Sequence, residues 1–494
     1  MEPPAARRRC HDAEDHISGL PDELLLIILL HLQSVAASAR TSVLSRRWRR
    51  VWSYLPELDL GGSPAPTTTS LARLDSVDGA IKSYSAPTLH RLKIDVSEID
   101  GCDDVPAHRV ASWLGFASQR VTGGVYIRLP WPLKLSATQE RRSTEEQLAL
   151  PACERATEID ITMGRMYSVL RLPPAGSFTA LTDLAVAGID MDGGELGRVV
   201  STQCPRLRNL RIRCIRLVGN QDVSIRSESL ECLEFPAAHR GQLEVTAPML
   251  LEISVARVAR AYIAAPKLEK VEWTGRYDPG SHEFDVAPRH LRSLSIMYST
   301  WISMLISSAW LVHRFDTVGE LSVSLGIDKE IEGYMAFLED MDKLPACETL
   351  IIHLFMKNHA FAPIMLHLLR RCSCIKKLKL FFNWHIPPKM TPCTTSGCPC
   401  LLPESCTLND ITFYSLEVIG ISFFTGSPEE EQFLKLLLSR CNMVTLKRVD
   451  LTVPSAPVSS KIMEIVEGIR GICCPKRKVQ FNVLAREVPK PSSY

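Results

Sequence analysis

A short recurring phrase constrains the fold of this chain more than any other feature. It follows the pattern L-x-x-L-x-L with variations, and clear copies are PTLHRLKI from Pro87, PRLRNLRI from Pro205, SLECLEF from Ser229, PMLLEISV from Pro248, PKLEKVEW from Pro266 and RHLRSLSI from Arg289. In an extended strand, successive side chains face opposite sides, so apolar residues two apart point into one core. Each copy therefore predicts one strand with a buried face and an open face.

The spacing of the copies predicts how these strands stack. Their leading leucines stand at 207, 230, 250, 268 and 291, which are 23, 20, 18 and 23 residues apart. This is close to the roughly 20 to 29 residues of leucine-rich repeats. Looser copies begin at Thr179, Gly319, Cys347, Ile375 and Met443. The fold class is therefore α/β, a leucine-rich-repeat-like solenoid in which stacked parallel strands form a curved sheet.

The residues between the buried positions of each copy would form the open face of that sheet. The leucines themselves are core, whereas the exposed strand face of a solenoid is a common binding surface. The alternative for each exposed residue is a solvated side chain with no binding role. The candidate substrate-binding residues are Arg211, Arg213, Glu234, Ser254, Glu272 and Ser295.

The N-terminal stretch, residues 15–60, carries more apolar surface than so small a unit can hide. Pro21 suits the first turn of a helix, and Asp22 and Glu23 complement its positive end. The residues from Leu24 to Leu30 are then all apolar. A helix that is apolar all round must be buried all round, and this run is too short for the roughly 20 residues that span a bilayer.

Two further short helices are expected in this stretch, one over residues 35–44 and one with an apolar stripe. The stripe is formed by Trp48, Val51, Trp52 and Leu55 at helical spacing, with arginines on the rest of the circumference. About 45 residues bury too little of their own surface to be comfortable alone. We therefore expect another protein to cover one face of residues 24–32 and one tryptophan. The alternative is packing against the rest of this chain only.

Three phrases in this stretch resemble the F-box of the plant F-box, leucine-rich-repeat and FBD proteins: DHISGLPDELLLIILLHL, ARTSVLSRRWRRVW and LPELDL. The resemblance implies docking onto a Skp-family adaptor and, through it, onto a cullin-RING ubiquitin ligase. The chain departs from the family at residues 32–34, where members commonly have Leu-Pro and a basic residue, so a looser turn is expected. Carried over by position, the adaptor-binding residues are Leu20, Pro21, Leu24, Ile28, Leu32, Val43, Leu44, Trp48 and Trp52.

Toward the C-terminus, the sequence resembles the FBD region of the same family. The matching parts are CPC and, beyond it, SLEVIGISFFTGSPEEEQFLKLLLSR, although the tryptophan that many members carry between them is missing. We expect a strand within residues 414–424 and a helix from Ser427, which is placed to cap it, to Arg440. A final strand is expected over residues 476–484.

A cysteine-rich loop precedes that region and invites a zinc interpretation. It holds Cys393, Cys398, Cys400 and Cys406, and His385 lies nearby. Structural zinc sites usually pair ligands two to four residues apart, and this set has no C-x-x-C. Reduced thiols are the favoured interpretation, and we predict no metal and no cofactor.

Composition excludes several classes of function. The 494 residues include 57 basic and 55 acidic ones, so the net charge of +2 favours no nucleic-acid partner. No secretory leader and no apolar run near 18 residues is found, which predicts an intracellular protein without a membrane partner, in the cytoplasm, the nucleus or both. Basic triplets at 7–9 and 476–478 fit nuclear targeting or plain solvated surface. The chain lacks G-x-S-x-G and H-E-x-x-H motifs and nucleotide loops, so we do not expect an enzyme.

Together these features predict a non-catalytic substrate-recognition subunit of a Skp-cullin-F-box ubiquitin ligase, with the repeats holding an unknown protein substrate. A leucine-rich-repeat binding scaffold or sensor that joins no ligase is the alternative. The expected parts are a tail (1–14), the F-box (15–60), a linker (61–85), the repeats (86–340), further repeats (341–388), the cysteine- and proline-rich loop (389–410), the FBD region with its closing strand (411–486) and a tail (487–494).

Overall fold

The structure of the chain, a computed structural model, divides into two compact units, Met1–Asp190 and Met191–Tyr494. We call them the N-terminal and C-terminal units, and each is described by itself. The residues that the structure describes are 19–31, 45–61, 70–97, 105–130, 147–163, 169–213, 216–235, 241–275, 277–297, 309–327, 344–356, 360–372, 374–382, 412–454, 460–473 and 479–485.

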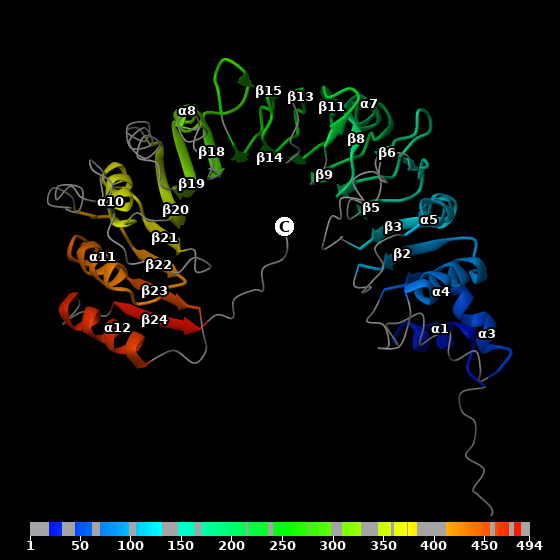
Figure 1. The fold of residues 1–494 in the computed structure, drawn as a ribbon, viewed down its shortest axis with the longest axis horizontal. Helices are drawn as coiled ribbons and strands as arrows, with labels where there is room; N and C mark the ends of the chain where they lie inside the picture. Colours follow the sequence, from blue (N-terminus) through cyan, green and yellow to red (C-terminus); the bar gives the residue numbers. More distant parts are fainter. Residues whose placement is uncertain are drawn as a thin grey trace, which may run out of the picture. The chain divides into compact units, whose positions relative to one another are not determined.

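The N-terminal unit combines short helices with a parallel sheet (Figure 1). The sheet has the order β1-β2-β3-β5-β7, and β4 and β6 form a separate parallel pair. The helices are α1 (Asp22–His31), α3 (Trp48–Val51), the 3-10 turn η2 (Trp52–Tyr54), α4 (Ser70–Ser83) and α5 (Ala107–Arg120). The strands are β1 (Glu57–Asp59), β2 (Leu89–Asp95), β3 (Val121–Arg128), β4 (Gln147–Ala149), β5 (Glu158–Thr162), β6 (Val169–Arg171) and β7 (Asp183–Ala187).

Helix α4 lies inside the segment that was expected to be a linker, residues 61–85. One face of α4 is buried and consists of Leu74, Val77 and Ile81. Their helical spacing places them on the same face. Asp78 fixes α4 to α5 by accepting a hydrogen bond of 2.7 Å from Trp113 Nε1. The expected linker therefore contains a helix that begins at Ser70, and the linker expectation is wrong for residues 70–83.

The C-terminal unit is built on a longer parallel sheet with the strand order β9-β12-β14-β16-β18-β19-β20-β21-β22-β23-β24. These strands are β9 (Asn209–Arg213), β12 (Cys232–Phe235), β14 (Glu252–Ala256), β16 (Lys270–Thr274), β18 (His290–Met297), β19 (Thr317–Ile327), β20 (Ala346–Met356), β21 (Lys377–Phe382), β22 (Val418–Ser422), β23 (Arg448–Val453) and β24 (Gln480–Ala485). All the clear and loose copies of the repeated phrase in this unit form strands, as predicted.

Buried and half-exposed residues alternate along these strands, and this alternation gives the sheet its two faces. In β14, for example, Ile253 and Val255 are buried while Ser254 between them is half-exposed. The buried face is covered near β18 to β24 by α8 (Ala309–His313), α10 (Ala362–Arg371), α11 (Pro428–Ser439) and α12 (Ser460–Cys473), which Figure 1 shows along one side of the strands. The coarse α/β prediction with a parallel sheet is confirmed.

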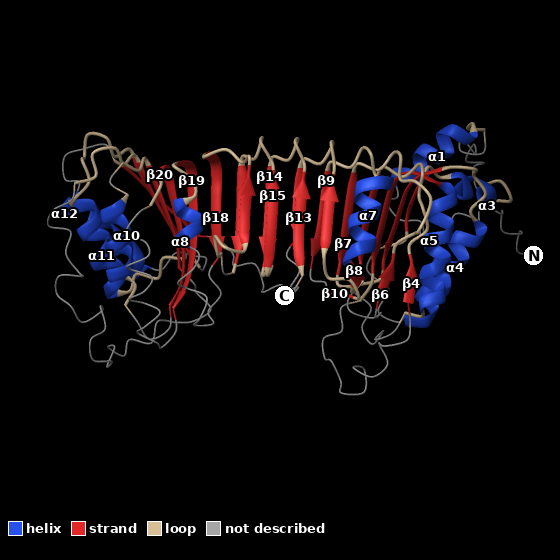
Figure 2. Cartoon of the chain, turned by 90° about the horizontal axis from the view of Figure 1, so that it is seen from above, coloured by secondary structure: helices blue, strands red, loops and turns tan. Residues whose placement is uncertain are grey.

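A second, smaller sheet takes the place of helices between β9 and β18. Its strands are β11 (Val223–Arg226), β13 (Gln242–Thr246), β15 (Arg260–Ala264) and β17 (His282–Asp285), all parallel (Figure 2). Repeats only 18 or 20 residues long leave little room between strands, and a short extended segment is what fits there. This unit also holds α7 (Gly193–Gln203) and the short pair β8 (Met191–Asp192) and β10 (Leu217–Val218).

Helix α11 confirms the capping expected from the sequence. Ser427 accepts a hydrogen bond from Glu430 N, Glu430 accepts one from Ser427 N, and Pro428 occupies the first helical position. Several other expectations lie outside the described residues, namely the helix over 35–44 and the loop that carries Cys393, Cys398, Cys400 and Cys406.

Candidate functional site

Helix α1 presents an apolar face whose side chains are about half exposed. Only Leu25 and Leu29 of the helix are buried. Leu24 is 44% exposed, Ile27 49% and Ile28 40%, and these three stand at positions i, i+3 and i+4. We call them the α1 apolar face. Contiguous exposed apolar side chains of this kind mark interaction sites.

The start of α1 is held by a residue from the segment before α3. Arg47 Nη2 lies 2.6 Å from Asp22 Oδ1, and the same guanidinium donates a hydrogen bond to Leu20 O. The amides of Leu24 and Leu25 both donate to Pro21 O at 3.2 Å. These contacts set the direction of α1 and thereby fix where the α1 apolar face points relative to α3.

The predicted adaptor-binding residues fall into three groups in the structure. Pro21, Leu24 and Ile28 are exposed, and Leu20 is half-buried. Trp48 and Trp52 are only 7% and 9% exposed, so both tryptophans pack within this chain, and their contact with an adaptor stays a prediction. Leu32, Val43 and Leu44 lie outside the described residues. Ile27 was missed, although its spacing from Leu24 pointed to the same face.

The short helices near the tryptophans are anchored to the following sheet. Ser53 O accepts hydrogen bonds from the amides of Ser85 and Ala86. Tyr84 Oη donates to Leu55 O at 3.0 Å or to Thr88 O at 2.8 Å. Burial raises the pKa of Tyr84 to about 12, so the phenol stays protonated and keeps its donor. The base of this module is therefore rigidly tied to β2.

The predicted substrate-binding residues line up across the sheet of the C-terminal unit. In the strand register, Arg211 pairs with Glu234, Glu234 with Ser254, Ser254 with Glu272, and Glu272 with Ser295. Arg213 stands two residues further along β9 on the same face. All six are half-exposed or exposed. The structure thus brings them together in one row, and their binding to a substrate stays a prediction.

This row extends beyond the residues that were singled out from the sequence. From Ser295 the register continues through Ser322, Ile351, Lys379, Gly420, Asp450 and Asn482. We call the whole series the strand-face row. The signal for four of the missed members was present, because Ser322, Ile351, Lys379 and Asp450 occupy the same place in a looser copy of the phrase. Gly420 and Asn482 lie in strands that were expected without such a copy.

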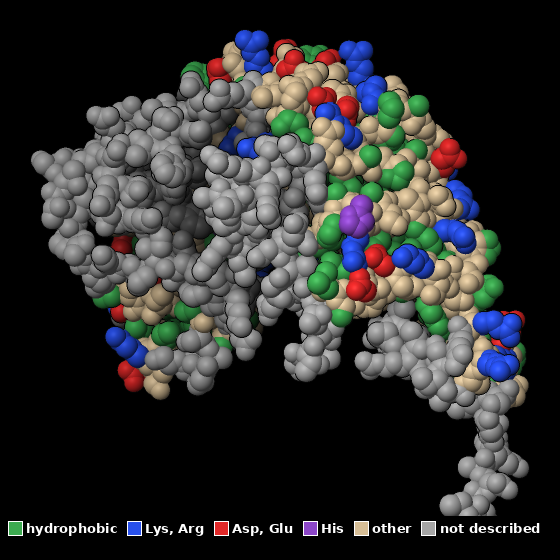
Figure 3. All heavy atoms as spheres, turned by 45° about the vertical axis from the view of Figure 1, so that its right-hand side comes forward, with side chains coloured by type: hydrophobic (Ala, Val, Ile, Leu, Met, Phe, Trp, Pro, Cys, Tyr) green, Lys and Arg blue, Asp and Glu red, His purple; other side chains and the backbone are tan. Residues whose placement is uncertain are grey.

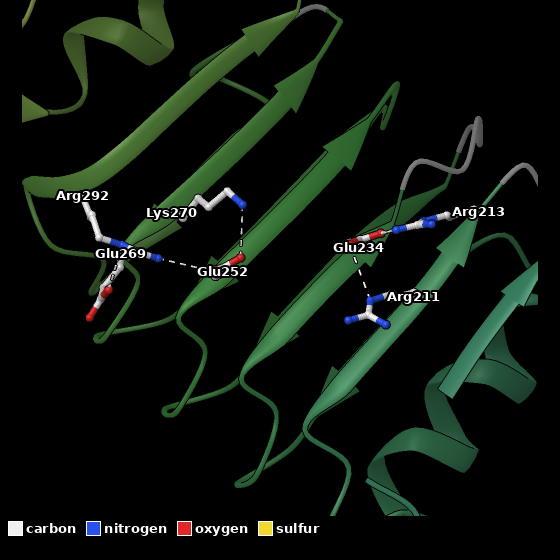
Figure 4. A network of polar contacts seen from close by, with 7 residues as sticks. All are labelled: Arg211, Arg213, Glu234, Glu252, Glu269, Lys270 and Arg292. Carbon is white, nitrogen blue, oxygen red and sulfur yellow. Dashed lines mark hydrogen bonds and ion pairs between the residues drawn. The ribbon is translucent and has the colours of Figure 1, made fainter. Parts of the chain in front are cut away.

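Charged side chains of opposite sign neighbour one another on this face (Figure 4). Glu234 accepts a hydrogen bond of 2.7 Å from Arg213 Nε and lies 3.6 Å from Arg211 Nε. Glu252 pairs with Lys270 at 3.2 Å and with Arg292 at 3.1 Å. Exposed pairs of this kind contribute at most about 1 kcal/mol each to stability.

No single sign of charge dominates the surface seen in Figure 3, where basic and acidic side chains are interspersed over the part drawn in colour. Within the described ranges, no group of three or more His, Cys, Asp or Glu side chains is placed to hold a metal ion. Burial raises the pKa of the Cys153 thiol to about 11 and that of Cys204 to about 12, which keeps both protonated and unreactive at neutral pH. Of the helices described, none is long and apolar enough to cross a membrane.

Comparison with known proteins gives these two surfaces a context. Residues 17–59 match the F-box domain family. The chain is 26% identical over 227 residues to an F-box protein of Arabidopsis thaliana, covering 46% of this chain and 65% of that protein. It is 39% identical over 85 residues to an F-box/FBD/LRR-repeat protein of the same plant, covering 17% and 18%. A second F-box/FBD/LRR-repeat protein is 24% identical over 460 residues, covering 82% and 94%.

The segment that carries α1 matches the F-box domain family. More narrowly, the chain is similar along most of its length to plant F-box/FBD/LRR-repeat proteins, which confirms the resemblance stated from its motifs. It spans less than two thirds of the first two relatives that it matches.

Proposed function

We propose that this chain is the substrate-recognition subunit of a Skp-cullin-F-box ubiquitin ligase. Its F-box docks a Skp-family adaptor, and through that adaptor the chain joins a cullin-RING ligase. The observation that carries the proposal is the α1 apolar face, because it lies in the segment that matches the F-box domain and its side chains stay 40–49% exposed.

The proposal assigns the substrate to the strand-face row. A leucine-rich-repeat-like solenoid is supported by the repeat spacing, the parallel register and the alternation of buried and open residues. The FBD region, residues 411–486, holds β22, α11, β23, α12 and β24 in this interpretation. Its strands extend the same sheet, since β22 pairs with β21. The substrate surface therefore runs into this region as well.

The chain would position the substrate for ubiquitin transfer and would supply no catalytic group. Holding a target close to a charged conjugating enzyme raises the local concentration of the target's lysines, as tethering does for any linked reaction. This role needs an adaptor surface and a substrate surface on one chain. It needs no nucleophile, acid or base from the chain itself.

Affinity purification of the full chain from cells tests the proposal. The wild type should bring down a Skp-family adaptor and a cullin, whereas a variant with Leu24→Asp and Ile28→Asp should bring down neither. Val444→Asp is the matched control, because Val444 is 73% exposed and lies in the C-terminal unit. Recovery of the adaptor without any cullin would favour the alternative, a binding scaffold or sensor that joins no ligase.

A further inference from the structure

The strand-face row is interrupted by a hollow at Gly420. In the register, Gly420 stands between Lys379 on β21 and Asp450 on β23. A space of about 300 Å³ lies at this position, and Lys377, Phe381 and Arg448 also line it. The volume is at the small end of the range for ligand sites, so it suits a side chain better than a drug-sized molecule.

The glycine is not required by the backbone at this position. Gly420 is absent from the residues with a positive φ, and a Cβ built there would meet its nearest atom, Lys379 Cγ, at 3.8 Å. An alanine would therefore fit in ordinary van der Waals contact. A side chain at this position would therefore begin to occupy the hollow without a clash at its Cβ.

The carboxylates around the hollow already have cationic or amide partners. Asp450 lies 2.8 Å from Arg448 Nε and accepts a hydrogen bond of 2.7 Å from Asn482. Glu320 lies 3.7 Å from Lys379 Nζ. These pairs leave little negative charge to attract a cationic ligand.

Of the lysines that line the hollow or lie near it in sequence and register, Lys377 differs from the others in its pairing. Lys376 is bonded to Glu348, and Lys447 to Glu417, each at 2.7 Å. Lys377 is exposed and has no hydrogen bond or ion pair within the ranges that the structure describes. Its positive charge helps to lower the pKa of Glu348 and of Glu417. An anionic group entering the hollow would thus find one cation that is free to pair with it.

The other lining residues fit a short aliphatic side chain that ends in an anionic group. Ser422 and Thr452 bring hydroxyl groups to the hollow, and Phe381 forms an apolar wall. The Phe381 ring is stacked on His353 at 4.5 Å with an interplanar angle of 10°. This stacking holds the wall in place.

We propose that the hollow at Gly420 binds the carboxylate of a glutamate or aspartate in an acidic segment of the recruited protein, with Lys377 as the pairing cation. A phosphate carries nearly two charges and is typically held by clusters of arginine, so one unpaired lysine fits a carboxylate better. This inference rests on the proposed function, because it treats the strand-face row as the substrate surface.

The test measures binding of peptides to the full chain by fluorescence anisotropy. The probes are a fluorescein-labelled glutamate-rich decapeptide, its glutamine counterpart and its phosphoserine counterpart. The glutamate peptide should bind the wild type, should weaken as salt is added, and should bind at least about tenfold less well to Gly420→Leu and to Lys377→Gln. Lys461→Gln, which removes an exposed lysine of α12, should bind like the wild type.

Three results would overturn the inference. One is no binding of the glutamate peptide to the wild type, and another is binding that Gly420→Leu leaves unchanged. Tighter binding of the phosphoserine peptide with the same dependence on Lys377 would replace the carboxylate by a phosphate. Melting curves, with Gly420→Ala as a milder variant, separate lost binding from lost folding. If the strand face still captures a substrate while Gly420→Leu has no effect, the proposed function stands and only the assignment of the hollow falls.

Discussion

Glu429 Oε1 lies 2.8 Å from the backbone nitrogen of Phe361, a residue 68 positions earlier in the chain. The same carboxylate also accepts a hydrogen bond from Ala362 N, and Phe361, at the N-cap of α10, offers no side-chain cap of its own. An acidic residue in the first turn of α11 therefore caps α10. This contact ties the FBD-like region to the repeat before it.

Replacing this distant cap should loosen α10. Glu429→Ala leaves helix amides without an acceptor, and losing a cap costs about 1 to 2 kcal/mol. Hydrogen exchange of the first amides of α10 should then speed up by roughly fivefold to thirtyfold. Glu431→Ala is the control, since Glu431 forms an ion pair with Lys435 on its own helix. Equal exchange in the two variants would show that the cap is unimportant.

The stability of α11 should depend on pH through two buried carboxyl groups. Burial raises the pKa of Glu429 and of Glu430 above the ordinary value of 4.5. A raised pKa in the folded state means that the contribution to stability is fully present below that ordinary value and is lost as the pH rises through the folded value. Glu430→Gln should flatten the fall in α11 protection that begins as the pH rises above 4.5. A slope equal to that of the wild type would contradict this origin.

The ion pair between Arg47 and Asp22 should contribute only modestly to the stability of the segment that matches the F-box domain. Asp22 is 62% exposed, and pairs of this kind are worth up to about 1 kcal/mol. In a double-mutant cycle of Asp22→Asn and Arg47→Gln, the coupling should lie below that figure, measured by hydrogen exchange of α1. A coupling of several kcal/mol would mean that the pair is far better shielded from water than its exposure indicates.

The strand-face row should contact the recruited protein directly. A photo-crosslinking amino acid at Ser254 or Ser295 should form adducts with the substrate when the proteasome is inhibited. The same amino acid at Val286 should not, because Val286 is exposed but lies between β17 and β18, outside the row. Adducts formed equally at all three positions, or at Val286 alone, would move the substrate surface elsewhere.

Strand positions and their faces were predictable because the signal is local. Apolar residues two apart with polar residues between them favour a strand with one buried face. As expected, this face buries Leu233, Ile253 and Leu294. The helix from Ser427 was predictable for a similar reason, since its cap and its first turn are adjacent in sequence.

The remaining features depend on contacts between distant residues. Nothing near Phe361 in the sequence shows that Glu429 caps its helix. The strands β11, β13, β15 and β17 carry only a few apolar residues each, so their pairing with one another decides their structure. The residues that line the hollow at Gly420 come from several strands, and the register places the glycine between Lys379 and Asp450. Among the adaptor-binding candidates, the burial of Trp48 and Trp52 also depends on packing that spacing alone does not predict.

The affinity of the purified full chain for a Skp-family adaptor tests the central claim most directly. Ile28→Asp places a charge in the α1 apolar face without opening the core, and losing such an anchor should cost on the order of 2 kcal/mol, at least a tenfold rise in Kd. Val444→Asp, the same kind of change at an exposed valine outside the F-box, should leave Kd unchanged. An adaptor that binds the wild type and Ile28→Asp equally well, or neither of them, would contradict the account.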